Sequence, residues 1–218
     1  MRLEPITWDR LTEAVADRIT RTTAADGGPW LRVAVDGAPA TGTGAAASGL
    51  AEALRLRGRS VLVIAASGFL RPASLRYEHG REDPDSYYAD RLDTGALWRE
   101  VFAPLEPGGQ GRVLPDLRDP VTDRATRSAY RELPPGGVLV LHGPLLLGHW
   151  FPFDLTVHLG LSPGALRRRT DETEHWALPA FARYEREVAP ADSADVVVRA
   201  DDPRHPAWNH PWGPPGEA

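Results

Sequence analysis

A glycine-rich segment at residues 36–44 has the spacing of a loop that could hold a phosphate group. The pattern G-x-x-x-x-G-K-[ST] is met at its glycines, which are Gly37 and Gly42. Thr43 stands at the lysine position, and Gly44 at the position of the hydroxyl that holds Mg²⁺. Successive backbone N–H groups at a helix N-terminus can bind an anion. The glycines therefore keep a loop that could still hold an anion, while the charged part of the chemistry is changed.

No lysine elsewhere in the sequence can replace the missing one, because all 25 basic residues are arginine. Phosphoryl transfer depends on positive charge placed around the transferred group, and Thr43 offers only a neutral donor. We therefore predict that this segment forms a turn shaped to bind an anion. A turn that binds no ligand is the simplest alternative. A dinucleotide-type loop is a further alternative, since Gly42-Thr43-Gly44 followed by Ala47 imitates G-x-G-x-x-A. The next apolar run ends in Ala65-Ala66-Ser67, without the acidic residue that a ribose needs, which disfavours that alternative.

Two titratable residues follow apolar runs and are candidate proton acceptors. Asp36 directly precedes the loop, and His142 ends the run that begins at residue 138. Ligand sites of α/β proteins form at the carboxyl ends of strands, so either side chain could act as a base. The simpler interpretations are that Asp36 hydrogen-bonds the loop and that His142 is packed. A cluster near the C-terminus, His205, Trp208, His210 and Trp212, lacks acidic or cysteine neighbours at metal spacing, so we predict no metal site there.

The elements that must position these residues alternate between strands and helices. We expect buried strands at residues 31–35, 60–65, 138–141, 155–159 and 195–199. We expect helices at residues 7–22, 45–56, 94–103, 123–133 and 179–188, and one that starts at Ser162 with Pro163 in its first turn. This alternation predicts a three-layer α/β fold with a mostly parallel sheet of about five strands.

The length and composition indicate one soluble domain. A chain of 218 residues can bury a sizeable core, and we place the domain at residues 1–202, followed by an irregular tail rich in Pro and Trp at 203–218. The net charge of −5 disfavours nucleic-acid binding, and no apolar run could span a membrane. There is no cysteine and no signal-peptide pattern at the start, so we expect a cytoplasmic protein. A homodimer is a further expectation, through the N-terminal helix and the tail.

Four blocks in this order resemble the uridine kinase-like branch of the P-loop kinases, and more narrowly its degenerate actinobacterial members that are often labelled uridine kinase. The blocks are residues 35–44, residues 69–88, residues 138–147, and the run Arg167-Arg168-Arg169 with the late strand at 194–198. The resemblance implies a P-loop kinase fold, ATP and Mg²⁺ as cofactors, and a nucleoside or another small phosphate-bearing ligand. It places Gly37, Gly42, Thr43, Gly44, Arg167, Arg168 and Arg169 around the phosphates. It places Arg71, Arg76, Tyr77, Arg81, Tyr87 and Tyr88 around the substrate.

The departures from this family fall on its reactive positions. Working members carry an aspartate base after the second strand, where this chain has Ser67 to Leu70, and an aspartate after the third strand, where it has His142. Together with Thr43 and Gly44, four reactive positions are changed. We therefore expect a kinase-like protein without ordinary ATP-dependent transfer that retains nucleotide, nucleoside or phosphate binding. The alternatives are an active transferase with arginine-based chemistry, using Asp36 or His142 as base, and a structural or assembly protein.

Overall fold

The computed structural model of the protein describes residues 2–209 and 212. Its main sheet has seven strands in the order β1-β9-β8-β7-β2-β6-β3. The five predicted strands form its parallel part, namely β2 (Leu31–Asp36), β3 (Val61–Ala65), β6 (Val138–Gly143), β7 (Leu155–Gly160) and β8 (Val196–Arg199). Two short strands, β1 (Glu4–Pro5) and β9 (Ala207–Trp208), extend one edge in antiparallel pairing. The α/β fold expected from the sequence is confirmed.

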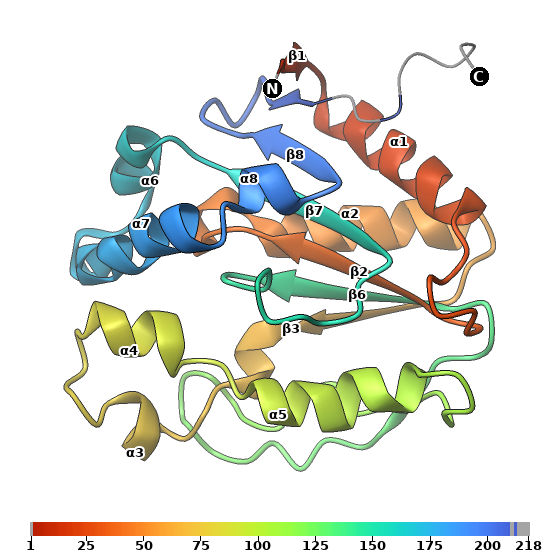
Figure 1. Ribbon diagram of the computed structural model, residues 1–218, viewed down its shortest axis with the longest axis horizontal. Coiled ribbons are helices and arrows are strands. Elements are labelled where there is room, and N and C mark those ends of the chain that lie inside the picture. Colours follow the sequence, from red (N-terminus) through yellow and green to blue (C-terminus); the bar gives the residue numbers. More distant parts are fainter. Residues whose placement is uncertain (1, 210–211, 213–218) are drawn as a thin grey trace.

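Helices cover both faces of the sheet, which gives the three layers seen in Figure 1. On one face lie α1 (Trp8–Arg21) and α2 (Thr43–Leu56), whose apolar side chains share a core with β2, β7 and β8. On the other face lies α5 (Thr94–Leu97), continued by a π-helical turn (Trp98–Phe102) and a 3₁₀ turn (Ala103–Leu105). Strand β2 is central and wholly buried, because both of its faces are covered.

The carboxyl ends of the parallel strands point toward a separate group of short helices (Figure 1). These are α3 (Ala73–Arg76), α4 (Pro84–Ala89), α6 (Pro163–Arg169) and α7 (Leu178–Glu187). The short helix α8 (Pro190–Ser193) follows α7 and leads into the amino end of β8. A 3₁₀ helix (Glu172–Ala177) joins α6 to α7. Tyr87 of α4 packs edge-on against Trp176 and Phe181, which fixes α4 beside α7. Ligand sites of α/β folds form at this end of the sheet.

The prediction of a helix at residues 123–133 is wrong. Asp123 and Arg127 have left-handed backbone angles, with φ of 56° and 53°, which no α-helix contains. The Asp123 carboxylate instead accepts hydrogen bonds from Ala73 N and from Arg76 Nη2, at 3.0 Å each. The segment ends in β5 (Arg131–Glu132), which pairs antiparallel with β4 (Arg112–Val113). Tertiary contacts have overridden local helix propensity here.

Residues 201–209 are less irregular than their composition predicts. Trp208 in β9 is 6% exposed, and β9 pairs with both β8 and β1, so residues 207–208 belong to the sheet. Across residues 2–209 and 212, none of the helices combines the length and the apolar character that crossing a bilayer requires.

Candidate functional site

The loop between β2 and α2 has a backbone that needs glycine at two positions. A Cβ atom at Gly37 would lie 2.7 Å from both the Leu159 carbonyl oxygen and Thr41 Oγ1, so a larger residue does not fit. Gly42 has φ of 80° and caps α2. The amides of Thr41 and Gly42 donate to Ala38 O and Pro39 O at 2.8 and 3.2 Å, within the turn. Donors for an anion therefore come from the first turn of α2, whose N–H groups lack intrahelical acceptors.

At the lysine and metal positions of the loop pattern, the structure has neutral groups that contact each other. Thr43 is 6% exposed, and its Oγ1 lies 3.5 Å from His142 Nδ1 at the end of β6. A Cβ atom at Gly44 would lie 3.3 Å from His142 Cε1, so the imidazole also covers this glycine. Burial lowers the pKa of His142, which leaves its ring neutral at pH 7. The contact thus brings no positive charge to the loop.

The residues at these positions do not fit the magnesium ion that the resemblance implies. Mg²⁺ takes oxygen ligands in near-octahedral geometry, usually carboxylates, hydroxyls, waters and substrate phosphates. Gly44 has no side chain, and His142 offers an imidazole where the family has a carboxylate. Over the described ranges 2–209 and 212, His, Asp and Glu side chains do not gather in any group of three or more that could hold a metal ion. A kinase-type magnesium site is therefore not supported by this donor set.

Asp36, a candidate base, is fully buried and engaged on both carboxylate oxygens. Its Oδ1 accepts a hydrogen bond from Leu146 N at 2.8 Å, and its Oδ2 lies 2.6 Å from His158 Nδ1. Burial alone would lower the pKa of His158, but the hydrogen bond to Asp36 and the negative charges of Asp36 and Glu185 raise it to about 9. Asp36 and His158 face each other because the β2–β7 register places them opposite. Asp36 is therefore hydrogen-bonded to the imidazolium of His158 and is not free to act as a base.

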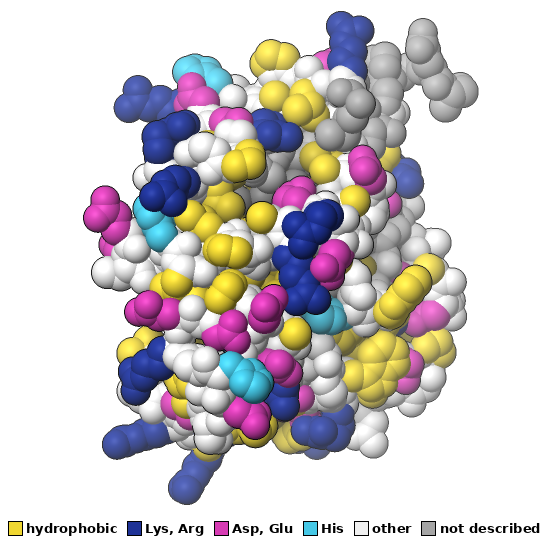
Figure 2. All heavy atoms as spheres, turned by 60° about the vertical axis from the view of Figure 1, so that its left-hand side comes forward, with side chains coloured by type: hydrophobic (Ala, Val, Ile, Leu, Met, Phe, Trp, Pro, Cys, Tyr) yellow, Lys and Arg dark blue, Asp and Glu magenta, His cyan; other side chains and the backbone are white. Residues whose placement is uncertain are grey.

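A cleft of about 570 Å³ opens beside this pair, between the loop and the helices α6 and α7. We call it the lid cleft. Its walls are largely apolar, and its polar lining includes Thr41, His158, Arg167, Glu185 and Arg199. The three arginines predicted to lie around the phosphates are all exposed. Arg167 lines the cleft, Arg169 donates to Ala200 O at 2.7 Å, and Arg168 is not among the described residues that line the cleft. Figure 2 shows this end of the molecule, where arginine, acidic and histidine side chains are mixed with hydrophobic ones.

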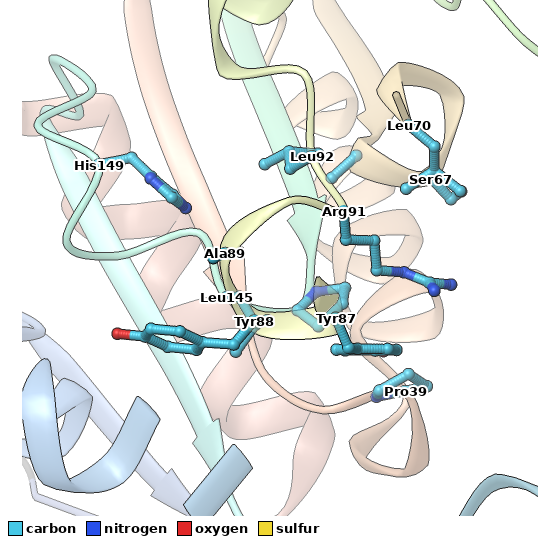
Figure 3. A pocket seen from close by; sticks show the side chains of 12 residues that line it. Pro39, Ser67, Leu70, Tyr87, Tyr88, Ala89, Arg91, Leu92, Leu145 and His149 are labelled. Atoms are coloured by element: carbon cyan, nitrogen blue, oxygen red, sulfur yellow. The ribbon is translucent and has the colours of Figure 1, made fainter. Parts of the chain in front are cut away.

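A smaller cavity of about 110 Å³ lies between the loop, the segment after β3 and α4. We call it the tyrosine pocket (Figure 3). The predicted residues Tyr87 and Tyr88 line it, together with Ser67, Arg91 and His149. The Arg91 guanidinium lies over the Tyr87 ring, 4.3 Å from its centroid. Leu145 lines both cavities, so they are neighbours.

The other predicted substrate residues form a separate ionic cluster around α3. Arg71 pairs with Asp90, and Arg76 is buried, donating to Asp123 and to the Tyr77 hydroxyl at 3.1 Å. Arg81 lies over the Tyr77 ring, 5.6 Å from its centroid. These residues are not among those that line the tyrosine pocket within the described part of the chain. Their contacts support the fold of the segment that carries Tyr87 and Tyr88.

Sequence reasoning missed seven polar residues that line the two cavities: Arg91, His149, His158, His175, Tyr184, Glu185 and Arg199. His158 had a usable signal, since it interrupts an apolar strand run with a polar ring that burial forces to find a partner. The partner could not be known without the register of β2 and β7. The tail cluster lies elsewhere, with His205 bonded to Asp202 and Trp208 packed edge-on against Trp212. His210 lies outside the described residues.

Solved structures share this fold, and two of those described here are of kinase-named proteins. One is named as a possible uridine kinase from Bacillus stearothermophilus, with 24% identity and a TM-score of 0.67 over 86% of this chain and 97% of that one. Another, from Silicibacter sp. TM1040, is named a putative fructose transport system kinase, with 23% identity and a TM-score of 0.57 over 86% and 93%. The YGR205w protein matches at 12% identity and a TM-score of 0.55, over 89% and 93%. No family model and no curated protein matches the chain in sequence.

These matches define the class of the fold. The chain has the α/β architecture of the P-loop kinases, with a mostly parallel sheet and a glycine loop that enters a helix. At this level of identity the likeness extends to the fold, and the chemistry has to be argued from the residues of the site.

Proposed function

We propose that this protein binds a nucleotide or a related phosphate-bearing ligand in the lid cleft and does not catalyse ordinary Mg·ATP-dependent phosphoryl transfer. The observation that carries the proposal is the contact between Thr43 and His142. The two side chains place neutral groups where the loop pattern has a lysine and a metal ligand. The glycine turn and the first turn of α2 are both present. Kinase-named proteins with this fold support the choice of ligand class.

The binding half of the proposal rests on the composition of the cleft. Small-molecule sites are mostly apolar cavities of about 300–1,000 Å³ with a few polar groups that fix orientation. The lid cleft, at about 570 Å³, lies in this range and combines apolar walls with Arg167 and Arg199. Arginine guanidinium groups suit phosphate recognition because they can donate two parallel hydrogen bonds. A nucleotide presents a planar apolar body and anionic groups, which this lining would match.

The catalytic half rests on what surrounds the loop. Transfer needs positive charge at the phosphates and a base near the acceptor hydroxyl. Thr43 supplies no charge, Asp36 is occupied by His158 and Leu146, and Ser67 lines the tyrosine pocket at the position that carries a family aspartate. An arginine-based transferase would have to place a base elsewhere, and His142 is the remaining candidate because its neutral ring can accept a proton.

The test is a calorimetric titration of the purified protein with ATP, UTP and uridine in EDTA, beside an assay for ADP formation with a panel of nucleosides and sugars. We expect nucleotide binding without turnover. Arg167→Gln should weaken binding by about tenfold, the usual effect of losing a charged hydrogen bond. Arg168→Gln is the matched control, since Arg168 is the next residue on α6, is also exposed, and is not among the described residues that line the cleft.

Three outcomes separate the alternatives. Turnover that is lost in His142→Asn would support the active transferase. Absence of binding to every nucleotide, together with absence of turnover, would contradict the proposal and favour a structural or assembly role. Equal effects of Arg167→Gln and Arg168→Gln would remove the lid cleft as the site.

A further inference from the structure

Three charged side chains are linked through His158 at the lid cleft: His158 and Glu185 line it, and Asp36 is buried behind the imidazole. Asp36 ends β2, His158 lies in β7, and Glu185 lies in α7. The Asp36 carboxylate lies 2.6 Å from His158 Nδ1, whereas Glu185 Oε1 lies 3.7 Å from His158 Nε2. The first distance is that of a short charged hydrogen bond, and the second is too long for a direct hydrogen bond.

The two carboxylates differ in how firmly they are held. The Asp36 side chain is fully buried and also accepts from the Leu146 amide, so its position is fixed. The Glu185 side chain is 52% exposed and reaches the imidazole from the side of the cleft. An exposed carboxylate at this distance gains little from its partner and can be displaced at small cost.

The edge of the imidazole that carries Nε2 faces two residues that line the cleft, Glu185 and Gly160, while the His158 side chain as a whole is 4% exposed. A Cβ atom at Gly160 would lie 3.3 Å from His158 Nε2, so a larger residue at this position would crowd that edge. With Nδ1 engaged by Asp36, the Nε2–H group of an imidazolium is the donor that remains. The groups around it are Asp36 from β2, Glu185 and the neutral Tyr184 from α7, and Arg199 at the end of β8.

We propose that Glu185 and an anionic oxygen of the ligand compete for His158 Nε2–H, so that His158 is a phosphate-binding residue and Glu185 limits the affinity of the site. Asp36 acts as a positioning residue, since it holds the ring through Nδ1 and sustains its charge. His158 thereby supplies, from a neighbouring strand, a positive charge that the loop does not carry at Thr43. This inference rests on the proposed function, because it assigns roles within the same cleft.

The experiment compares affinities for ATP and for inorganic pyrophosphate, measured by calorimetry in EDTA at pH 7. We expect Glu185→Gln to tighten binding of both probes by about tenfold, because the competing charge is removed. We expect His158→Gln to weaken binding by about tenfold or more, and the double variant to behave like His158→Gln alone. Glu187→Gln is the matched control, because Glu187 pairs with Arg183 on the same helix rather than with His158.

The variants separate failure of this inference from failure of the proposed function. Glu185 is exposed, so Glu185→Gln should fold normally, and its melting temperature would verify this. If the wild-type protein binds ATP and Glu185→Gln binds it equally well, the competition is refuted while the binding function stands. If neither protein binds ATP or pyrophosphate, both proposals fail. Binding by Glu185→Gln alone would support the competition at His158 and would contradict nucleotide binding by the wild-type protein.

Discussion

His142 shows at the residue scale how one substitution changes a loop. Its ring lies over the start of α2, against Thr43 and the open face of Gly44. An oxygen ligand at position 44 would have to share this space with the imidazole. The changes at positions 43, 44 and 142 are thus one packed arrangement, which the sequence presents as three separate losses.

A pair of glycines on α2 tests this packing. Gly49→Ala should raise the free energy of unfolding by about 0.5–1 kcal/mol, because alanine restricts the unfolded chain and favours helix. A Cβ atom at Gly49 would have no neighbouring atom within 4 Å. Gly44→Ala should gain less or lose stability, since its Cβ atom would lie 3.3 Å from His142 Cε1. Urea unfolding measures both, and equal gains would show that His142 does not press on Gly44.

The pair of His158 and Asp36 predicts a dependence of stability on pH. The pKa of His158 is raised from 6.5 to about 9 in the folded protein. Its contribution is therefore complete below about pH 6.5, and it is lost as the pH rises through about 9. The loss should amount to about 3 kcal/mol at most.

Urea unfolding at intervals between pH 6.5 and 9 measures this loss, with His158→Phe as the comparison. The variant should be less stable and should show a flatter profile over this range. Burial lowers the pKa values of His142 and His149, so those side chains affect stability below this range rather than within it. A wild-type profile as flat as that of the variant would contradict the assignment.

At the scale of elements, the sequence predicted the parallel strands well because buried parallel strands are continuous apolar runs. The same holds for α1, whose stripe of Leu11, Val15 and Ile19 faces the core. Residues 123–133 could not be predicted, because their conformation depends on Arg76 of α3, far away in the chain. The short strands β1 and β9 likewise exist only through pairing with each other and with β8.

The ion pair between Arg76 and Asp123 should stabilise the segment that carries the tyrosine pocket. Asp123→Ala would leave the guanidinium of Arg76, which is 5% exposed, without its carboxylate, at a cost of about 2–3 kcal/mol. Asp90→Ala is the control, because it breaks the more exposed pair with Arg71 and should cost less than about 1 kcal/mol. Chemical unfolding of the two variants gives the comparison. Similar losses would show that the pair does not organise this segment.

At the scale of the whole molecule, the fold and the site were predictable to different degrees. The loop was predicted from its glycine pattern, and Arg167 and the two tyrosines, which line the cavities, were predicted from the family resemblance. The charged side chains linked through His158 could not be predicted, because they come from three elements whose register and packing are set only in the folded protein. The result is a P-loop kinase fold whose positive charge lies at the sides of the cleft instead of in its loop.

The magnesium dependence of ATP affinity tests this account most directly. In P-loop kinases the metal bridges the phosphates and is held by the loop hydroxyl and an aspartate, and this chain has Gly44 and His142 at those positions. We predict that the dissociation constants for ATP in EDTA and in excess Mg²⁺, measured by calorimetry, agree within about threefold, a difference below 1 kcal/mol. Binding that is strengthened more than about tenfold by Mg²⁺, or absence of ATP binding in both conditions, would contradict it.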